Sequence, residues 1–352
     1  MKISSNNDWD PLKEIIVGKA DKARVPTVDL STMNMSYANY SIDKIKQLEG
    51  EYPNWIIDEA NEDAEELCDI LRQAGVVVHR PQDIDHSKKF STPHWSTTGW
   101  YSWCPRDLLL PLNNLMIETP SATRSRMFET YAYHDVMLKA IQDGTEWISS
   151  PKPKLLDELY QFTDLSKPTL KNLEPVFDAA NCVRLGRDIL FQISNTGNWL
   201  GFQWLKNTLE PRGYRLHAAE HVYSFSHFDS TIIPLRPGLV LLNSSRVNSN
   251  NCPNLFDSWD KIYFDNIDIK ETPQEGPGSI SPCSSYIGMN ILSIDTNTVI
   301  VSRDQINLIR VLEQNKMTVI PCTMRHAQTL SGGFHCATLD LVRQGSLEDY
   351  FS

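Results

Sequence analysis

The sequence of 352 residues lacks the features that mark several protein classes. Basic residues are fewer than acidic ones, 33 against 44, so the formal net charge is −11. Such an acidic protein is poorly suited to phosphate-based binding, and we expect no nucleic-acid partner. No apolar run approaches the ~18 residues needed to span a membrane, and the N-terminus has no apolar stretch typical of a signal peptide. We therefore expect a cytoplasmic protein without a membrane partner.

The cysteines form no pattern of a disulfide framework or a zinc site. There are seven of them, widely spaced, and no CxxC pair occurs. The glycine-rich phosphate loops GxGxxG and GxxxxGKS are absent as well. We expect neither a metal nor a cofactor, and we expect reduced thiols, one of which could be reactive.

Short apolar runs, many of them β-branched, alternate with helical patterns. At roughly 100–200 residues per domain, the length suggests two domains or one large one. Turn residues at 186–188, 236–238 and 295–298 predict hairpins, and a hairpin cannot lie inside a purely parallel sheet. The runs predict strands at 15–17, 76–78, 108–110, 115–117, 189–193, 231–233, 239–242, 290–294, 299–301 and 318–320.

Four stretches carry the spacing of amphipathic helices. The first runs over 60–74 and ends at Gly75, and the third covers 202–209. A fourth helix is expected through Leu308 and Leu312 with Asp304 as its N-cap. In the second, the residues expected on the buried face are Met127, Tyr131, His134, Leu138 and Ile141.

Three segments, 177–181, 226–231 and 331–336, place polar residues in apolar surroundings. Together they contain a thiol, an imidazole and carboxylates, which can act as nucleophile, proton shuttle and orienting group. Cys336 follows a Gly-Gly pair, although most cysteines only fill core space. His335 should point away from Cys336 in an extended segment, so we favour His227 as the acid/base. Asp107 opens an apolar strand, where a charge needs a partner.

The chain resembles the arginine amidinotransferases, of the glycine and inosamine-phosphate type. The resemblance runs from end to end and is closest to the inosamine-phosphate branch, with Asn181 where the glycine-directed enzymes have a second Asp. The segments that carry it are Asp8-Trp9-Asp10-Pro11-Leu12, Ile15-Ile16-Val17-Gly18, Cys104-Pro105-Arg106-Asp107, Ile117-Glu118-Thr119-Pro120, Pro151-Lys152-Pro153, Glu174-Pro175-Val176-Phe177-Asp178-Ala179-Ala180-Asn181, His227-Phe228-Asp229-Ser230-Thr231 and Gly332-Gly333-Phe334-His335-Cys336-Ala337-Thr338.

This resemblance implies a single domain over residues 1–352, an α/β propeller in which five pseudo-symmetric ββαβ modules surround a central active-site channel. It implies transfer of the amidino group of L-arginine to a primary amine through an amidino-cysteine, with release of ornithine. The implied roles are Cys336 as nucleophile, His227 as general acid/base, Asp178 as its orienting group, Asp107 and Asp229 as guanidinium ligands, and Arg246 and Ser285 as ligands of the donor α-carboxylate.

The acceptor amine is the open point. The glycine-directed enzymes of the family carry larger Asn and Met side chains where Ser224 and Ser226 stand here. We therefore expect a roomier acceptor site for an inosamine phosphate or lysine, in a pathway of antibiotic or toxin biosynthesis. A guanidine hydrolase resembling an arginine deiminase and a non-catalytic arginine-binding protein are the alternatives, and a homodimer is left open.

Overall fold

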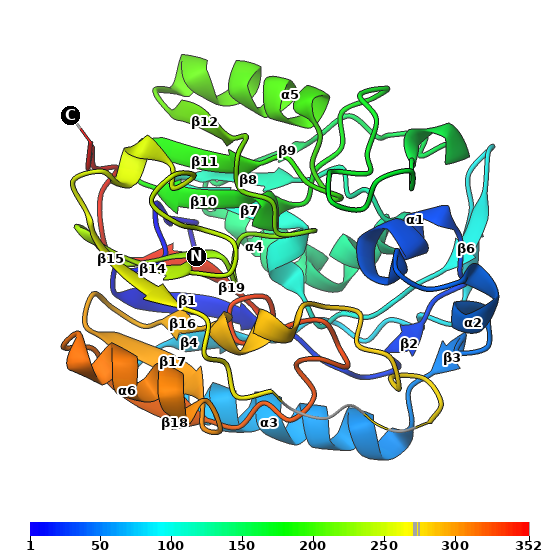
Figure 1. The fold of residues 1–352 in the computed structure, drawn as a ribbon, viewed down its shortest axis with the longest axis horizontal. Helices are drawn as coiled ribbons and strands as arrows, with labels where there is room; N and C mark the ends of the chain where they lie inside the picture. Colours follow the sequence, from blue (N-terminus) through cyan, green and yellow to red (C-terminus); the bar gives the residue numbers. More distant parts are fainter. Residues whose placement is uncertain (270–272, 274, 352) are drawn as a thin grey trace.

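The computed structural model describes residues 1–269, 273 and 275–351, in which five three-stranded sheets recur (Figure 1). In each sheet the central strand pairs antiparallel with one neighbour and parallel with the other. Four sheets follow the chain in order: β7 (Leu109–Leu112), β8 (Leu115–Glu118) and β9 (Glu146–Ser149); β10 (Cys182–Leu185), β11 (Asp188–Gln192) and β12 (Arg215–Ala219); β13 (Ile232–Arg236), β14 (Leu239–Asn243) and β15 (Asp260–Phe264); β16 (Leu292–Ser293), β17 (Thr298–Ser302) and β18 (Thr318–Cys322).

The fifth sheet joins the two ends of the chain. It has the order β19 (Thr338–Arg343), β1 (Leu12–Val17) and β4 (Val77–His79), with β19 antiparallel to β1. The parallel crossovers pass through α3 (Asn54–Gln73), α4 (His134–Gln142), α5 (Trp199–Leu209) and α6 (Ile306–Gln314), and through the short 3₁₀ helix η8 (Asn254–Phe256) in the third module. The predicted five-fold α/β propeller is therefore confirmed, and the hairpins lie at its antiparallel pairs.

Smaller elements lie between the modules. Two two-stranded sheets are formed by β2 (Arg24–Val25) with β3 (Gly50–Glu51) and by β5 (Lys89–Ser91) with β6 (Ser96–Thr98). The short α1 (Leu30–Thr32) continues into a π-helical turn, η1 (Met33–Tyr37), and α2 (Ile42–Lys46) follows. In the part of the chain that the structure describes, no helix is long and apolar enough to cross a membrane.

A buried ion network closes the fifth sheet. Asp340 of β19 is fully buried and forms ion pairs with Arg106, Arg184 and Arg343, and Nη1 of Arg106 lies 2.5 Å from Asp340 Oδ1. Arg184 also pairs with Asp8. Four parts of the chain thus meet at these charges, and a buried carboxylate of this kind is costly unless it is paired.

Helix α4 corrects one prediction. Its buried residues are Val136, Met137 and Ala140, whereas Leu138 is 51% exposed and Ile141 42% exposed. The predicted residues, which follow a 3-4-3 spacing, therefore lie on the outward face of the helix. Apolar residues occur on both sides of this helix, so their spacing alone cannot show which side is buried. Helix α6 likewise has Gln305, not Asp304, as its N-cap. Helices α3 and α5 bury the predicted faces.

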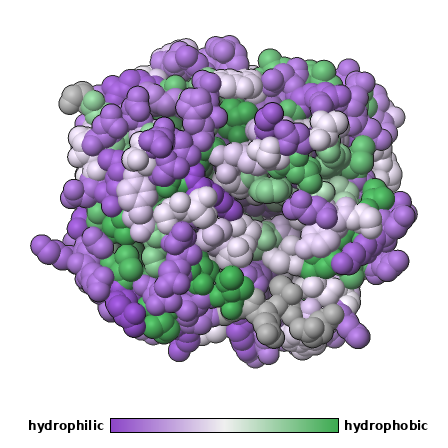
Figure 2. All heavy atoms as spheres, in the orientation of Figure 1, coloured by the Kyte–Doolittle hydropathy of each residue, from purple (hydrophilic) through white to green (hydrophobic). Residues whose placement is uncertain are grey.

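The surface in Figure 2 is mostly hydrophilic, with scattered apolar residues, and is hollowed near its middle. Exposed apolar side chains are ordinary when they are isolated. The outward-facing residues of α4 are therefore compatible with a folded chain.

The corrected face of α4 can be tested with neighbouring residues. Met137→Ala should lower the free energy of unfolding by about 2–5 kcal/mol, because it removes a buried side chain. Leu138→Ala should change it by less than about 0.5 kcal/mol, since that side chain is half exposed. Urea denaturation measures both, and a larger loss in Leu138→Ala would show that the face is wrongly assigned.

Candidate active site

A cavity of about 310 Å³ lies among the modules and collects most of the predicted site residues. It is lined by parts of the chain that are far apart in sequence, including the π-helical turn η1 and the segment 281–285. The predicted residues that line it are Cys336, His227, Asp229, Ser226, Arg246 and Ser285. Asp107 and Asp178 lie behind His227, buried at 1% and 0% exposure.

Cys336 sits in a helical turn that precedes β19. The Ala337 N–H donates to Gly333 O at 2.9 Å, and the Cys336 N–H donates to Asn290 Oδ1 at 3.0 Å. The amide of Asn290 donates to Cys336 Sγ at 3.1 Å. Asn290 thereby fixes both the backbone and the sulfur of Cys336.

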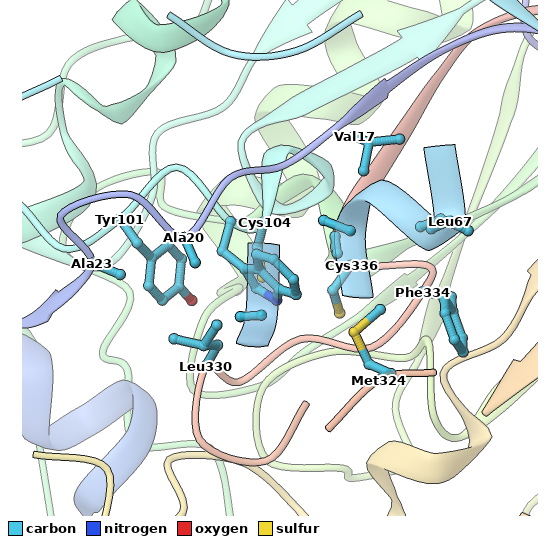
Figure 3. Close-up of a cluster of buried hydrophobic side chains, with 14 of the residues drawn as sticks. Val17, Ala20, Ala23, Leu67, Tyr101, Cys104, Met324, Leu330, Phe334 and Cys336 are labelled. Atoms are coloured by element: carbon cyan, nitrogen blue, oxygen red, sulfur yellow. The ribbon is translucent and has the colours of Figure 1, made fainter. Parts of the chain in front are cut away.

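The surroundings of Cys336 keep its thiol protonated in the absence of substrate. It belongs to an apolar cluster that includes Met324 and Phe334 (Figure 3). The hydrogen bond with Cys104, burial and the charge of Asp229 raise the pKa of the thiol well above its ordinary value. Its Sγ donates to Asp229 Oδ2 at 2.8 Å. A thiolate at this position needs a positive charge nearby.

His227 lies between two buried carboxylates. Its Nε2 is 3.0 Å from Asp178 Oδ2, and its Nδ1 is 3.6 Å from Asp107 Oδ1. Burial by itself lowers the pKa of His227, but the charge of Asp107 and the hydrogen bond with Asp178 raise it well above the ordinary value. The imidazole is therefore held in its protonated form, which can give a proton to a departing group.

Asp107 is supported from the side away from His227. Arg126 donates to Asp107 Oδ2 at 2.6 Å and forms two bonds of 2.8 Å with Glu129. Burial raises the pKa of Asp107. Asp107 Oδ1 has no hydrogen-bond partner among the described residues, so it can accept one from a ligand.

Asp229 contacts both the thiol and the histidine beside it. His335 Nδ1 is 3.2 Å from Asp229 Oδ2, so the expectation that His335 points away from Cys336 is wrong. The segment is a helical turn rather than a strand, and successive side chains there diverge by about 100° instead of 180°. Both side chains therefore reach the same carboxylate.

Arg246 supplies a cation to the cavity. It donates to Thr231 Oγ1 at 2.8 Å and to Ser284 Oγ at 2.6 Å, and its guanidinium lies over the Tyr286 ring. No carboxylate among the described residues pairs with it, so it can bind an anionic group of a ligand. Ser285 opens the 3₁₀ helix η9 (Ser285–Met289) at the same wall.

The loop that carries His227 is fixed through one carbonyl. The Ser226 carbonyl accepts bonds from Asn181, Ser194 and Thr196, at 3.0, 2.7 and 2.9 Å. Phe225 adopts a φ of +66° in this loop, which is a strained conformation for a non-glycine residue. Asn181 is thus a buried donor that holds the loop.

Sequence reasoning missed Asn290, Arg126 and the π-helical turn. Asn290 was assigned only to a strand, yet a buried amide at the edge of an apolar run needs partners, and this was an available signal. The π-helical turn has no comparable sequence signal, because it is defined by backbone hydrogen bonds. Such turns are frequent at functional sites.

Comparisons with known proteins agree along the whole chain. No family model matches it. An inosamine-phosphate amidinotransferase from Streptomyces glaucescens is 44% identical over 349 residues, which cover 99% of each chain. A mitochondrial glycine amidinotransferase from Xenopus tropicalis is 35% identical over 370 residues, covering 99% of this chain and 85% of the relative.

Two solved structures are similar over their full lengths. An inosamine-phosphate amidinotransferase from Streptomyces griseus has a TM-score of 0.95 at 44% identity. An amidinotransferase of the saxitoxin biosynthetic pathway from Microseira wollei has a TM-score of 0.88 at 35% identity. Each comparison covers 99% of both chains.

The state of His227 can be tested by titration. In Asp178→Asn the pKa of His227 should fall toward its ordinary value, because a neighbouring charge and hydrogen bond that favour the imidazolium are lost. NMR of ¹³C-labelled histidine measures the shift, with His227→Gln to assign the signal and the remote histidines as controls. An unchanged titration would contradict the proposed coupling of Asp178 to His227.

Proposed function

The chain belongs to the amidinotransferase family, and from this premise we propose that it transfers the amidino group of L-arginine to a primary amine through an amidino-Cys336 intermediate. The observation that carries the proposal is the placement of a buried thiol and a protonated imidazole in one cavity with a carboxylate and the guanidinium of Arg246, which pairs with no carboxylate among the described residues. These are the groups needed to bind arginine at both ends and to attack its central carbon.

Arginine binding is the first step. Asp229 and Asp107 hold the planar guanidinium through charge-assisted hydrogen bonds, and Arg246 with Ser285 holds the α-carboxylate. The arriving cation offsets the negative charge of Asp229 beside Cys336 Sγ. The donor thus lowers the pKa of the thiol that attacks it.

Two transfers follow. Cys336 releases its proton to solvent as the bound cation lowers the pKa of its thiol, and its thiolate attacks the central guanidinium carbon. His227, oriented by Asp178, gives a proton to the departing amine, so that ornithine leaves. The acceptor amine then attacks the carbon of amidino-Cys336 while His227 takes its proton, and the thiol is regenerated. Water must be kept out, because its attack on the intermediate would release urea.

The acceptor is proposed to be bulkier than glycine. Ser224 and Ser226 both line the cavity, and Ser224 is further held by its bond to the His227 carbonyl, at 2.7 Å. Small side chains at these places favour an inosamine phosphate or lysine. The structural relative from the saxitoxin biosynthetic pathway supports the proposal of a role in specialised metabolism. The cytoplasmic location, the single domain and the homodimer stay predictions.

Two alternatives are distinguished by their products. A guanidine hydrolase would form citrulline from arginine and water, without need of an amine. A non-catalytic binding protein would retain arginine and release no ornithine. The paired His227 and Asp178 favour transfer chemistry over simple binding.

The covalent step can be detected directly. Incubation with arginine alone should add one amidino group to Cys336, observed by mass spectrometry of the intact protein and its peptides. Cys336→Ala should form no adduct, whereas Cys252→Ala, which changes a thiol at a different cavity, should form it normally. An adduct-free wild-type protein that still produces citrulline would support the hydrolase instead.

Acceptor size can be tested by Ser226→Met. The larger side chain should reduce turnover of lysine and inosamine phosphate by about tenfold or more, since a clash of this kind costs at least 1–3 kcal/mol. The amidino-Cys336 formed from arginine alone is the internal control and should be unchanged. Glycine as the best acceptor of the wild-type enzyme would refute the roomier site.

A further inference from the structure

His335 links the active-site carboxylate to the buried ion network. Its Nδ1 is 3.2 Å from Asp229 Oδ2, and its Nε2 is 3.6 Å from Asp8 Oδ1. Asp8 is held in turn by Arg184. An imidazole that faces carboxylates at both nitrogens can donate at both only as the imidazolium.

The side chain of His335 does not line the 310 Å³ cavity that Asp229 borders. Asp229 lines the 310 Å³ cavity, and His335 borders a separate small cavity shared with Asp8. His335 therefore has no direct contact with the donor site. Any effect it has on the reaction must act through Asp229.

Asp229 contacts the Cys336 thiol and, under the proposed function, binds the guanidinium of arginine. Both interactions depend on the orientation of its carboxylate. Its Oδ2 accepts from both Cys336 and His335, which leaves Oδ1 to face a ligand. Burial raises the pKa of Asp229, but the hydrogen bond and the charge of His335 lower it well below the ordinary value. Without this neighbour, a carboxylate in such a site would rotate and take up a proton more easily.

We propose that His335 is a positioning residue, which anchors the Asp229 carboxylate to Asp8 so that one oxygen faces the Cys336 thiol and the other faces the guanidinium of the donor. The inference rests on the proposed function. The inference also gives a role to Asp8. This residue belongs to the N-terminal segment beside β19, and through His335 it would orient the carboxylate that binds arginine.

The charges around this link include two further carboxylates and one further arginine, because Asp107 repels Asp229, Asp340 repels Asp8, and Arg343 attracts Asp8. Asp229 faces His335, Cys336 and His227. Asp8 faces His335, Arg184 and Arg106, and Arg106 Nε donates to the His335 carbonyl at 3.3 Å. Substitution of His335 removes a group that contacts both carboxylates, while the three arginines of the network remain.

The test compares variants that keep or lose a hydrogen-bond donor to the Asp229 carboxylate. His335→Ala should lower kcat/KM for arginine on the order of 10²-fold, because misplacement of a binding group by about 1 Å has that effect. The KM for arginine should rise as well. The acid limb of the pH profile should move to higher pH, since the pKa of Asp229 rises when its charged neighbour is lost, and Asp229 must be ionised to bind the donor.

His335→Asn separates position from charge. Its amide nitrogen can replace Nδ1 as donor to Asp229, so it should recover most of kcat/KM but retain the shifted acid limb. His335→Gln, whose amide extends toward the place of Nε2, should recover less. If His335→Ala fails to fold, the comparison of Asn with Gln decides, and equal impairment of these two overturns the proposal.

Controls separate this inference from the proposed function. His79→Ala removes another histidine paired with a carboxylate, Glu14, at 3.0 Å, and should leave kcat/KM and the pH profile unchanged. Arginine affinity measured by calorimetry in a Cys336→Ala background should fall in His335→Ala even if no transfer activity is found. Wild-type kinetics, acid limb and affinity in folded His335→Ala would overturn the inference while leaving the proposed function intact.

Discussion

Asp340 and the three arginines around it form the interaction on which the site depends. This carboxylate lies on β19, the strand that completes the first module, and Arg343 lies on the same strand, whereas Arg106 and Arg184 come from two other parts of the chain. Arg106 precedes β7 and Arg184 lies on β10, so the charge of Asp340 is paired only when β19 lies against both of these modules. Because Cys336 lies two residues before β19, closure of the propeller also sets the position of the nucleophile.

The electrostatics of the cavity are arranged for a cationic ligand. Without it, Cys336 is a protonated thiol beside Asp229, and His227 is protonated between Asp107 and Asp178. His227 is thus ready to donate a proton, whereas the thiol is not in its reactive form until a positive charge reaches the carboxylates. Under the proposed function, binding of the correct donor and activation of the nucleophile are the same event, which limits reaction of the thiol with other molecules.

Much of the fold could be predicted from the sequence because its modules are local. In modules whose strands follow one another in the sequence, the antiparallel pairs are hairpins with recognisable turns. Helices α3 and α5 each have a single apolar face. Helix α4 could not be oriented in this way, because it carries apolar residues on both faces and only its packing on the sheet selects Met137. The edge strands β9, β12 and β15 were missed, since partial exposure weakens their apolar pattern. The buried strand β19 was missed as well.

For the site, the sequence by itself determined which residue types are present and, through the family resemblance, which of them are candidates. Cys336, His227 and Asp178 could be named in this way because their motifs are local. The tertiary structure alone decided how these groups act on one another. Asn290, Arg126 and His335 gain their roles from contacts between distant segments, and the helical turn at Cys336 brings His335 to Asp229 against the simplest reading of adjacent residues. Pairing of buried charges depends on distances in space, and these are fixed only when the five modules close into a ring.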